Sequence, residues 1–160
     1  MITAYRIVSH IWGEELLSSG FPARWNSAQV YVIYCAESRS LATLENIAHR
    51  KRNGLNARFT LQVVEIPDDI KVESINKKVL PPKWSLANEE AYEKCREIGD
   101  LWVSKQKSAV LAVPSAIVND EINYLLNPNH SDFCKIKLIK KEVYRFDPRL
   151  GIEDEKRSAH

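Results

Sequence analysis

Short runs of apolar residues and two longer segments with helical periodicity dominate the pattern of this chain. The short runs are rich in β-branched and aromatic residues, which favours strands. These predicted strands cover residues 4–8, 29–35, 59–66, 109–113, 136–139 and 143–146. Residues 67–82 are polar and contain prolines, which predicts a loop.

Two segments repeat apolar residues every three or four positions and predict helices. The first begins at Ser38 or Ser40, either of which can cap it, and runs to about Arg52. Its apolar stripe consists of Leu41, Leu44, Ile47 and Ala48. The second begins near Asn88 and runs to about Lys105. Its stripe consists of Ala91, Cys95, Ile98 and Trp102.

Strands and helices do not alternate strictly, so a doubly wound parallel sheet is not supported. The predicted class is α+β. A length of 160 residues, 44% of them hydrophobic, suits a single compact domain. We place that domain at residues 1–150 and expect the charged tail 151–160 to fray.

Charge and cysteine content narrow the class of protein. The 23 lysines and arginines against 21 acidic residues leave a net charge of +2, which disfavours direct nucleic-acid binding. Three widely spaced cysteines fit neither a disulfide scaffold nor a metal knuckle, and favour a reducing compartment. The first residues lack the pattern of a signal peptide, and no segment is apolar enough to span a bilayer. We therefore expect a soluble cytoplasmic protein without membrane contact.

Standard catalytic and cofactor motifs are absent from the sequence. It contains neither a glycine-rich dinucleotide turn, a P-loop nor a Gly-x-Ser-x-Gly elbow. The four histidines show no metal-ligand spacing with cysteines or carboxylates. The sequence therefore predicts no bound metal and no resident cofactor.

Glu45 is the most informative polar residue. In helical projection it lies at the edge of the apolar stripe, where an ionised carboxylate is costly unless it is paired or used. It is either a flank glutamate paired with His49 or Lys51, or a carboxylate that faces a pocket.

Two arginines and two hydroxyl residues complete the candidate set. Arg24 lies in an Arg-Trp-Asn loop that could present its guanidinium to a diphosphate, and Arg6 lies within an apolar strand, where it reaches solvent or a cleft. Ser115 follows a buried strand and a proline, and is either a turn residue or a side chain facing a cleft. Tyr34 is either a core residue or a ring that stacks on a flat ligand.

Taken in order, these residues resemble the RES domain, a bacterial toxin family named for arginine, glutamate and serine. The similarity extends over nearly the whole chain, and the Asn-Pro-x-His-x-Asp-Phe block is its most specific part. The matching blocks are Tyr5-Arg6, Arg24-Trp25-Asn26, Tyr34, residues 41–45 with His49, Pro82-Lys83-Trp84, Gly99-Asp100-Leu101-Trp102, Val113-Pro114-Ser115-Ala116, residues 121–133 and Phe146-Asp147-Pro148-Arg149-Leu150.

The resemblance implies a fold like that of ADP-ribosyltransferases, with a mixed sheet and flanking helices. It implies consumption of NAD as a substrate, growth arrest, and inhibition by a helix-turn-helix, Xre-like antitoxin encoded beside it. In that mechanism Glu45 stabilises the ribosyl cation, and Arg6 and Arg24 hold the diphosphate. Tyr34 stacks on nicotinamide and Ser115 positions the ribose or the amide.

The sequence leaves the acceptor open. Water or phosphate would make the reaction NAD breakdown, which we favour, and a protein side chain would make it ADP-ribosylation of a target. A catalytically dead module that only binds its antitoxin is a third possibility, which the retained Arg24, Glu45 and Ser115 disfavour. Ala23 and Ala28 stand where family members tend to have glycine, which restricts the backbone of this loop.

Overall fold

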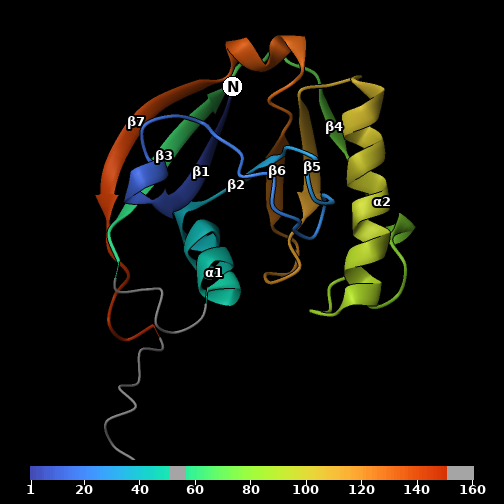
Figure 1. Ribbon diagram of the computed structural model, residues 1–160, viewed down its shortest axis with the longest axis horizontal. Helices are drawn as coiled ribbons and strands as arrows, with labels where there is room; N and C mark the ends of the chain where they lie inside the picture. The colour runs from blue at the N-terminus through green and yellow to red at the C-terminus, as the bar shows by residue number, and fades with distance from the viewer. Residues whose placement is uncertain (51–56, 151–160) are drawn as a thin grey trace, which may run out of the picture.

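The computed structural model of the protein describes residues 1–50 and 57–150 (Figure 1). The fold is α+β, as the sequence predicts, with a seven-stranded sheet in the order β4-β5-β6-β2-β1-β3-β7. The strands are β1 (Ile2–Ser9), β2 (Ile33–Ala36), β3 (Phe59–Ile66), β4 (Val72–Ser74), β5 (Val110–Pro114), β6 (Ile122–Leu126) and β7 (Lys137–Tyr144). The helices are α1 (Arg39–His49) and α2 (Glu89–Lys105), with short 3-10 turns η1 (His10–Trp12), η3 (Lys77–Val79) and η4 (Ser131–Lys135).

Most strand pairs are antiparallel, and β4 with β5 is the one parallel pair among the described strands. β1 lies inside the sheet between β2 and β3. Its register with β3 places Arg6 opposite Gln62. The fully buried Gln62 amide donates to the carbonyls of Gly13 and Glu15 at 3.0 and 2.9 Å, which fixes the start of the loop that leads to β2.

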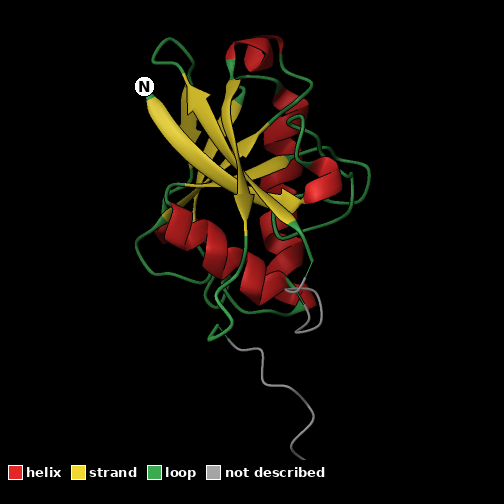
Figure 2. Ribbon diagram, turned by 90° about the vertical axis from the view of Figure 1, so that its left-hand side faces the viewer, coloured by secondary structure: helices red, strands yellow, loops and turns green. Residues whose placement is uncertain are grey.

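Each helix has a polar cap at its first turn. Ser38 accepts a hydrogen bond from the Leu41 N–H at 3.0 Å, and Asn88 accepts one from the Ala91 N–H at 2.9 Å. α2 runs beside β4 and β5, whereas α1 packs on β1 and β2 (Figures 1 and 2). The two helices therefore cover different parts of the sheet.

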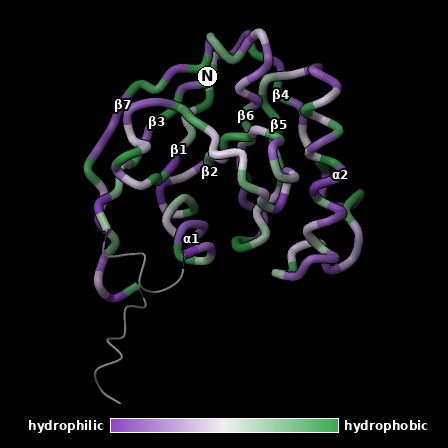
Figure 3. Tube along the Cα trace, in the orientation of Figure 1, coloured by the Kyte–Doolittle hydropathy of each residue, from purple (hydrophilic) through white to green (hydrophobic). Residues whose placement is uncertain are grey.

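Three clusters of buried apolar side chains form the core, and their members come from both halves of the chain. The largest fully buried side chains include Phe59, Ile33 and Leu41. Figure 3 shows hydrophilic and hydrophobic residues mixed along α2 and along β7, because each has one face toward solvent.

Several predicted strand limits were wrong. Residues 67–82 are not all loop, since they contain β4, and β6 was not predicted. The strand predicted at 29–35 is confined to Ile33–Ala36, and Gln29, with a positive φ of 66°, lies in the turn that precedes it. The strands predicted at 136–139 and 143–146 are the single edge strand β7.

The predicted apolar face of the first helix was right for Leu41 and for Ile47, which packs against a core cluster, and wrong for the other two residues. Its buried residues are Leu41 and Ala42, whereas Leu44 and Ala48 are exposed. The helix ends at His49 with Arg50 in extended conformation, and the predicted end near residue 52 lies outside the described residues. For the second helix the prediction holds closely, with Gly99 buried beside Ala91, Cys95 and Trp102.

The Asn-Pro-x-His-x-Asp-Phe block has a structural role. Asn127 N–H donates to the Ala109 carbonyl at 2.9 Å, and the His130 ring accepts from the Asp132 N–H at 3.0 Å as the cap of η4. In Figure 1 this short orange turn lies at the end of the sheet opposite α1. The most specific sequence block therefore stabilises the fold away from α1.

Candidate active site

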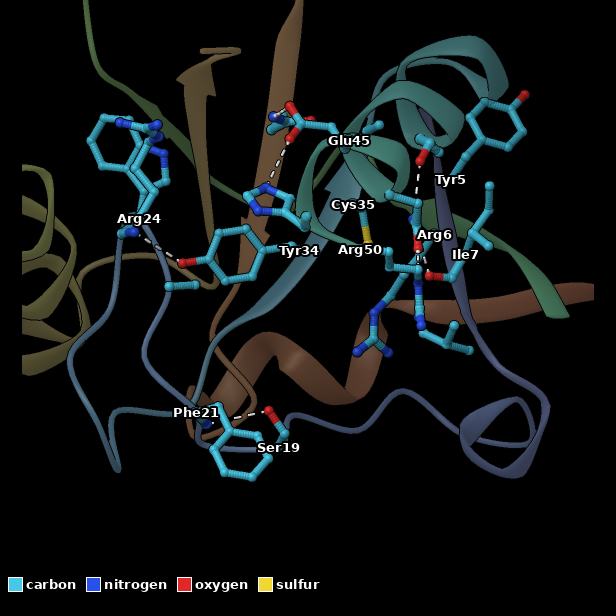
Figure 4. Close-up of a pocket in the computed structure, with 18 of the residues that line it drawn as sticks. Tyr5, Arg6, Ile7, Ser19, Phe21, Arg24, Tyr34, Cys35, Glu45 and Arg50 are labelled. Carbon is cyan, nitrogen blue, oxygen red and sulfur yellow. Dashed lines mark hydrogen bonds and ion pairs between the residues drawn. The ribbon is translucent and has the colours of Figure 1, made fainter. Parts of the chain in front are cut away.

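A cavity of about 730 Å³ lies between α1, the inner strands and the loop that joins η1 to β2 (Figure 4). Its size is within the range of about 300–1,000 Å³ that is typical of small-molecule sites. Four of the five predicted site residues line it: Arg6, Arg24, Tyr34 and Glu45. The fifth, Ser115, does not line the cavity but donates a hydrogen bond to Glu45.

The Glu45 carboxylate is held by three side chains from different elements. Ser115 Oγ and Asn123 Nδ2 donate to its Oε1 at 3.0 and 2.5 Å. His49 Nε2, one turn later on α1, lies 3.4 Å from Oε2. Both earlier interpretations of Glu45 are therefore realised, because it pairs with His49 and also faces the cavity.

These contacts keep Glu45 ionised. Burial alone would raise its pKa, but the hydrogen bonds from His49, Asn123 and Ser115 outweigh burial and hold the pKa of this carboxyl below its usual value. The side chain is 19% exposed, so the charge reaches the cavity without being solvated on all sides. The result is a fixed negative group in the cavity wall.

Ser115 is buried and does not line the cavity. Its Oγ donates to Glu45 and accepts from the N–H groups of Ile117 and Val118, each at 3.1 Å. A hydroxyl with its donor and acceptor capacity engaged in this way orients the carboxylate. This geometry is that of a positioning residue.

Tyr34 forms part of the cavity wall and also holds the Arg-Trp-Asn loop. Its hydroxyl donates to Asn26 Oδ1 at 2.6 Å and accepts from the Trp25 N–H at 3.1 Å. Burial raises the pKa of this hydroxyl, which stays neutral. The Asn26 amide in turn donates to the carbonyls of Phe21, Ser27 and Val30, and these bonds tie the two sides of the loop together.

The Arg24 guanidinium is engaged with backbone carbonyls. Nη1 donates to Trp84 O at 2.6 Å, and both terminal nitrogens lie 3.2 Å from Leu86 O. The guanidinium also stacks 4.4 Å from the centre of the Tyr92 ring. Arg24 thus ties its loop to residues 84–86, besides lining the cavity.

We expect Arg24→Lys to lower the free energy of unfolding by about 2 kcal/mol, because one ammonium cannot reproduce the planar fork on these carbonyls. This corresponds to a fall in Tm of roughly 4–8 °C by calorimetry. Arg145→Lys, at an exposed position outside the cavity, is the matched control. Equal Tm values for the two variants would contradict the scaffolding role.

Arg6 is the second cation of the wall. Its Nη1 donates to Gln62 Oε1 at 3.3 Å and its Nη2 to the Leu17 carbonyl at 2.8 Å. Burial lowers its pKa from the ordinary arginine value, and the group remains charged at neutral pH. In Figure 4, Arg24 lies at one side of the cavity and Arg6 at the other, with Tyr34 and Glu45 between them.

Helix α2 fixes the Arg-Trp-Asn loop from outside. Arg96 Nε donates to Ala23 O at 2.8 Å, and the Asp100 carboxylate accepts from both the N–H and the hydroxyl of Ser27, at 2.9 and 2.5 Å. Between them, Gly99 packs so closely that an added Cβ would lie 1.7 Å from the Trp25 carbonyl oxygen. The Gly99-Asp100 pair therefore sets the position of the loop.

Alanine is compatible with the loop at both positions where family members tend to have glycine. Neither Ala23 nor Ala28 has a positive φ, and the left-handed positions nearby are Gly20 and Gln29. Ala23 N–H also donates to the Asn26 carbonyl at 3.0 Å, closing a tight turn.

Sequence reasoning missed two residues of the site. Asn123 lies within a family block and Arg50 lies near the predicted end of the first helix, but neither was singled out as a candidate. Both line the cavity. Asn123 is the one amide in the otherwise apolar and aromatic run 122–126, and that isolated polar position is the signal that could have indicated it.

Across residues 1–50 and 57–150, no group of three metal-ligating side chains comes together. The cysteines are Cys35, Cys95 and Cys134, and all three are free. Burial raises the pKa of Cys35, on the cavity wall, to about 12, so its thiol is not an activated nucleophile. Within the same ranges, no helix combines the length and apolarity needed to cross a bilayer.

The chain belongs to the RES domain family, whose domain model matches residues 3–147. It is 37% identical over 129 residues to the Prs ADP-ribosylating toxin of Sphingobium sp. (strain YBL2), which covers 79% of each chain. It is 33% identical over 132 residues to Toxin Res of Yersinia enterocolitica, covering 81% of this chain and 84% of that one. With Toxin Res of Pseudomonas putida it shares 32% identity over 151 residues, covering 93% and 96%.

The fold is similar to a chain in the crystal structure of the M. tuberculosis MbcT-MbcA toxin-antitoxin complex. The TM-score is 0.64 over 90% of this chain and 84% of that chain, with 16% sequence identity. At that identity the likeness concerns the fold alone. It confirms the α+β architecture expected from the family resemblance.

Proposed function

We propose that this protein is the toxin of a bacterial toxin-antitoxin system and that it cleaves NAD at the bond between nicotinamide and ribose. The observation that carries the proposal is the ionised Glu45 carboxylate, fixed by Ser115 and Asn123 in the wall of a cavity that also holds arginines. The names of the RES relatives support the toxin role.

The chemistry requires a fixed anion. As the N-glycosidic bond breaks, its electron pair leaves with the nicotinamide ring, which is cationic in NAD and departs neutral without taking a proton. The ribose is left as an oxocarbenium-like cation, which a preorganised carboxylate stabilises. Glu45 supplies that charge, and Ser115 keeps it oriented. The acceptor oxygen then bonds to the sugar carbon and loses its proton.

The remaining residues are assigned by their position in the cavity. The Tyr34 ring stacks on the nicotinamide, and the positive charges of Arg6 and Arg24 attract the diphosphate. NAD is consumed as substrate, so no separate cofactor is required. The consequence in the cell is loss of NAD and growth arrest, which places the activity in the cytoplasm.

A second outcome of the same bond cleavage is transfer of ADP-ribose to a protein. The observation that favours it is the name of the Sphingobium relative, an ADP-ribosylating toxin that is 37% identical to this chain. The two outcomes differ only in the acceptor. We keep NAD breakdown as the first proposal, because it needs no partner at the cavity mouth.

Incubation of the purified protein with NAD should release nicotinamide, measured by liquid chromatography, with free ADP-ribose or its phosphate as the other product. If the acceptor is a protein, nicotinamide release should depend on an added bacterial lysate, and mass spectrometry should find an ADP-ribosyl group on a lysate protein. Absence of nicotinamide release under both conditions would sink the catalytic proposal and favour a binding module.

We further propose that a helix-turn-helix antitoxin inhibits the toxin by covering the cavity. A free NAD-consuming enzyme would harm the cell that makes it, and the structural neighbour was solved in a toxin-antitoxin complex. Co-expression with a small protein encoded by the adjacent reading frame should restore growth.

A further inference from the structure

Arg50 lies where α1 ends and the cavity begins. It is the residue after the helix, with extended backbone angles of φ −95° and ψ 137°, and its N–H donates to the Asn46 carbonyl at 2.9 Å. Arg50 lines the cavity, and Figure 4 shows it on the same side as Arg6.

The guanidinium of Arg50 is braced on one edge and one face. Its Nε donates to Asn46 Oδ1 at 3.0 Å, and its central carbon lies 4.5 Å from the centre of the Phe59 ring, which is buried. Asn46 is itself held, because its amide donates to the carbonyls of Ala42 at 3.0 Å and Ile7 at 3.3 Å. These contacts therefore orient the Arg50 guanidinium in the absence of a ligand.

The terminal nitrogens distinguish Arg50 from the other two cavity arginines. Arg6 and Arg24 each use both Nη atoms on protein oxygens. Among the residues that the structure describes, none accepts a hydrogen bond from either Nη of Arg50. Burial lowers the pKa of Arg50, which reflects a partly desolvated charge, and it stays protonated at neutral pH.

We propose that Arg50 is the principal contact for the diphosphate of the substrate, with Asn46 as its positioning residue; this rests on the proposed function. A planar fork with two terminal N–H groups matches phosphate oxygens in a bidentate way. Arg50 follows Glu45 by five residues, and both side chains line the same cavity. In NAD the ribose that carries nicotinamide is joined directly to the diphosphate. The proposal therefore assigns Glu45 to this ribose and Arg50 to the neighbouring diphosphate.

The test uses ADP as the probe, with binding to the intact protein measured by isothermal titration calorimetry. Arg50→Gln should weaken ADP binding about tenfold or more, and Arg50→Lys by less, since an ammonium keeps the charge without the fork. In nicotinamide release, Arg50→Gln should raise KM for NAD by a similar factor and change kcat by less than about threefold, because the contact is made equally in ground and transition states. Arg145→Gln, an exposed arginine outside the cavity, should leave both quantities unchanged.

Circular dichroism and Tm show whether Arg50→Gln is folded, and Asn46→Ala gives a second variant that retains the arginine. Asn46→Ala removes the side chain that orients Arg50 but keeps its charge. This variant should therefore bind ADP less tightly than the wild type and more tightly than Arg50→Gln. The inference is overturned if the wild type does not bind ADP, or if Arg50→Gln binds it as the wild type does. If ADP binding depends on Arg50 but nicotinamide is never released, the phosphate site stands and the proposed function falls.

Discussion

Replacing Glu45 by glutamine should abolish nicotinamide release while leaving the fold intact. Glutamine keeps an oxygen at the position that accepts from Ser115 and Asn123, so the hydrogen bonds at 3.0 and 2.5 Å can persist. It lacks the negative charge that stabilises the ribosyl cation. Loss of a preorganised electrostatic contact of this kind costs about 10²–10³-fold in kcat, which initial rates of nicotinamide formation will measure.

Two comparisons make this result specific. Glu97→Gln, on the solvent side of α2 where Glu97 pairs with Lys94, should retain wild-type rate and Tm. ADP binding by Glu45→Gln should also match the wild type, because the probe lacks the nicotinamide ribose. A Glu45→Gln protein that releases nicotinamide at the wild-type rate would remove the central step of the proposed mechanism.

Gly99→Ala should impair both stability and catalysis. In an ordinary helix, glycine to alanine is stabilising, since glycine costs about 0.5–1 kcal/mol relative to alanine. Here the new Cβ would lie 1.7 Å from the Trp25 carbonyl oxygen, so the Arg-Trp-Asn loop must move away from α2. Overpacking of this type costs about 1–3 kcal/mol, measurable by chemical denaturation.

The displaced loop also contributes to the cavity wall. It contains Arg24, which lines the cavity, and its Trp25 N–H donates to the hydroxyl of Tyr34, which lines the cavity as well. KM for NAD should therefore rise in Gly99→Ala. Glu93→Ala, an exposed position on the same helix, should be neutral or slightly stabilising. A Gly99→Ala protein with unchanged stability and KM would show that α2 does not set the loop position.

Local pattern was sufficient for the strands and helices with strong periodicity. β3 and α2 follow directly from their apolar residues and caps, and the α+β class follows from their order. β7 was divided because Lys140, Lys141 and Glu142 interrupt its apolar pattern. An edge strand with an exposed face tolerates such charges, and its position at the edge is a property of the sheet that no local pattern contains.

A site residue could be predicted where a charged side chain occurs at an apolar position of a helix or strand. Glu45 on a helix stripe and Arg6 in an apolar strand are conspicuous for that reason, whereas Arg50 stands in the basic run His49-Arg50-Lys51-Arg52 and looks like a residue that favours a helix terminus. Its orientation depends on Asn46 and Phe59, which are contacts across the fold. The role of Arg24 with residues 84–86 depends on a contact about 60 positions away, which no spacing rule reveals.

The sequence separation around Glu45 affects how the gene can be inactivated. The two groups that orient its carboxylate come 70 and 78 residues later, from opposite ends of the connection between β5 and β6. A ribosome that stops between codons 51 and 122 releases a fragment that contains all three cavity arginines but lacks Asn123, so the candidate catalytic centre is incomplete. Under the proposed function, nonsense and frameshift mutations before codon 123 should therefore abolish toxicity.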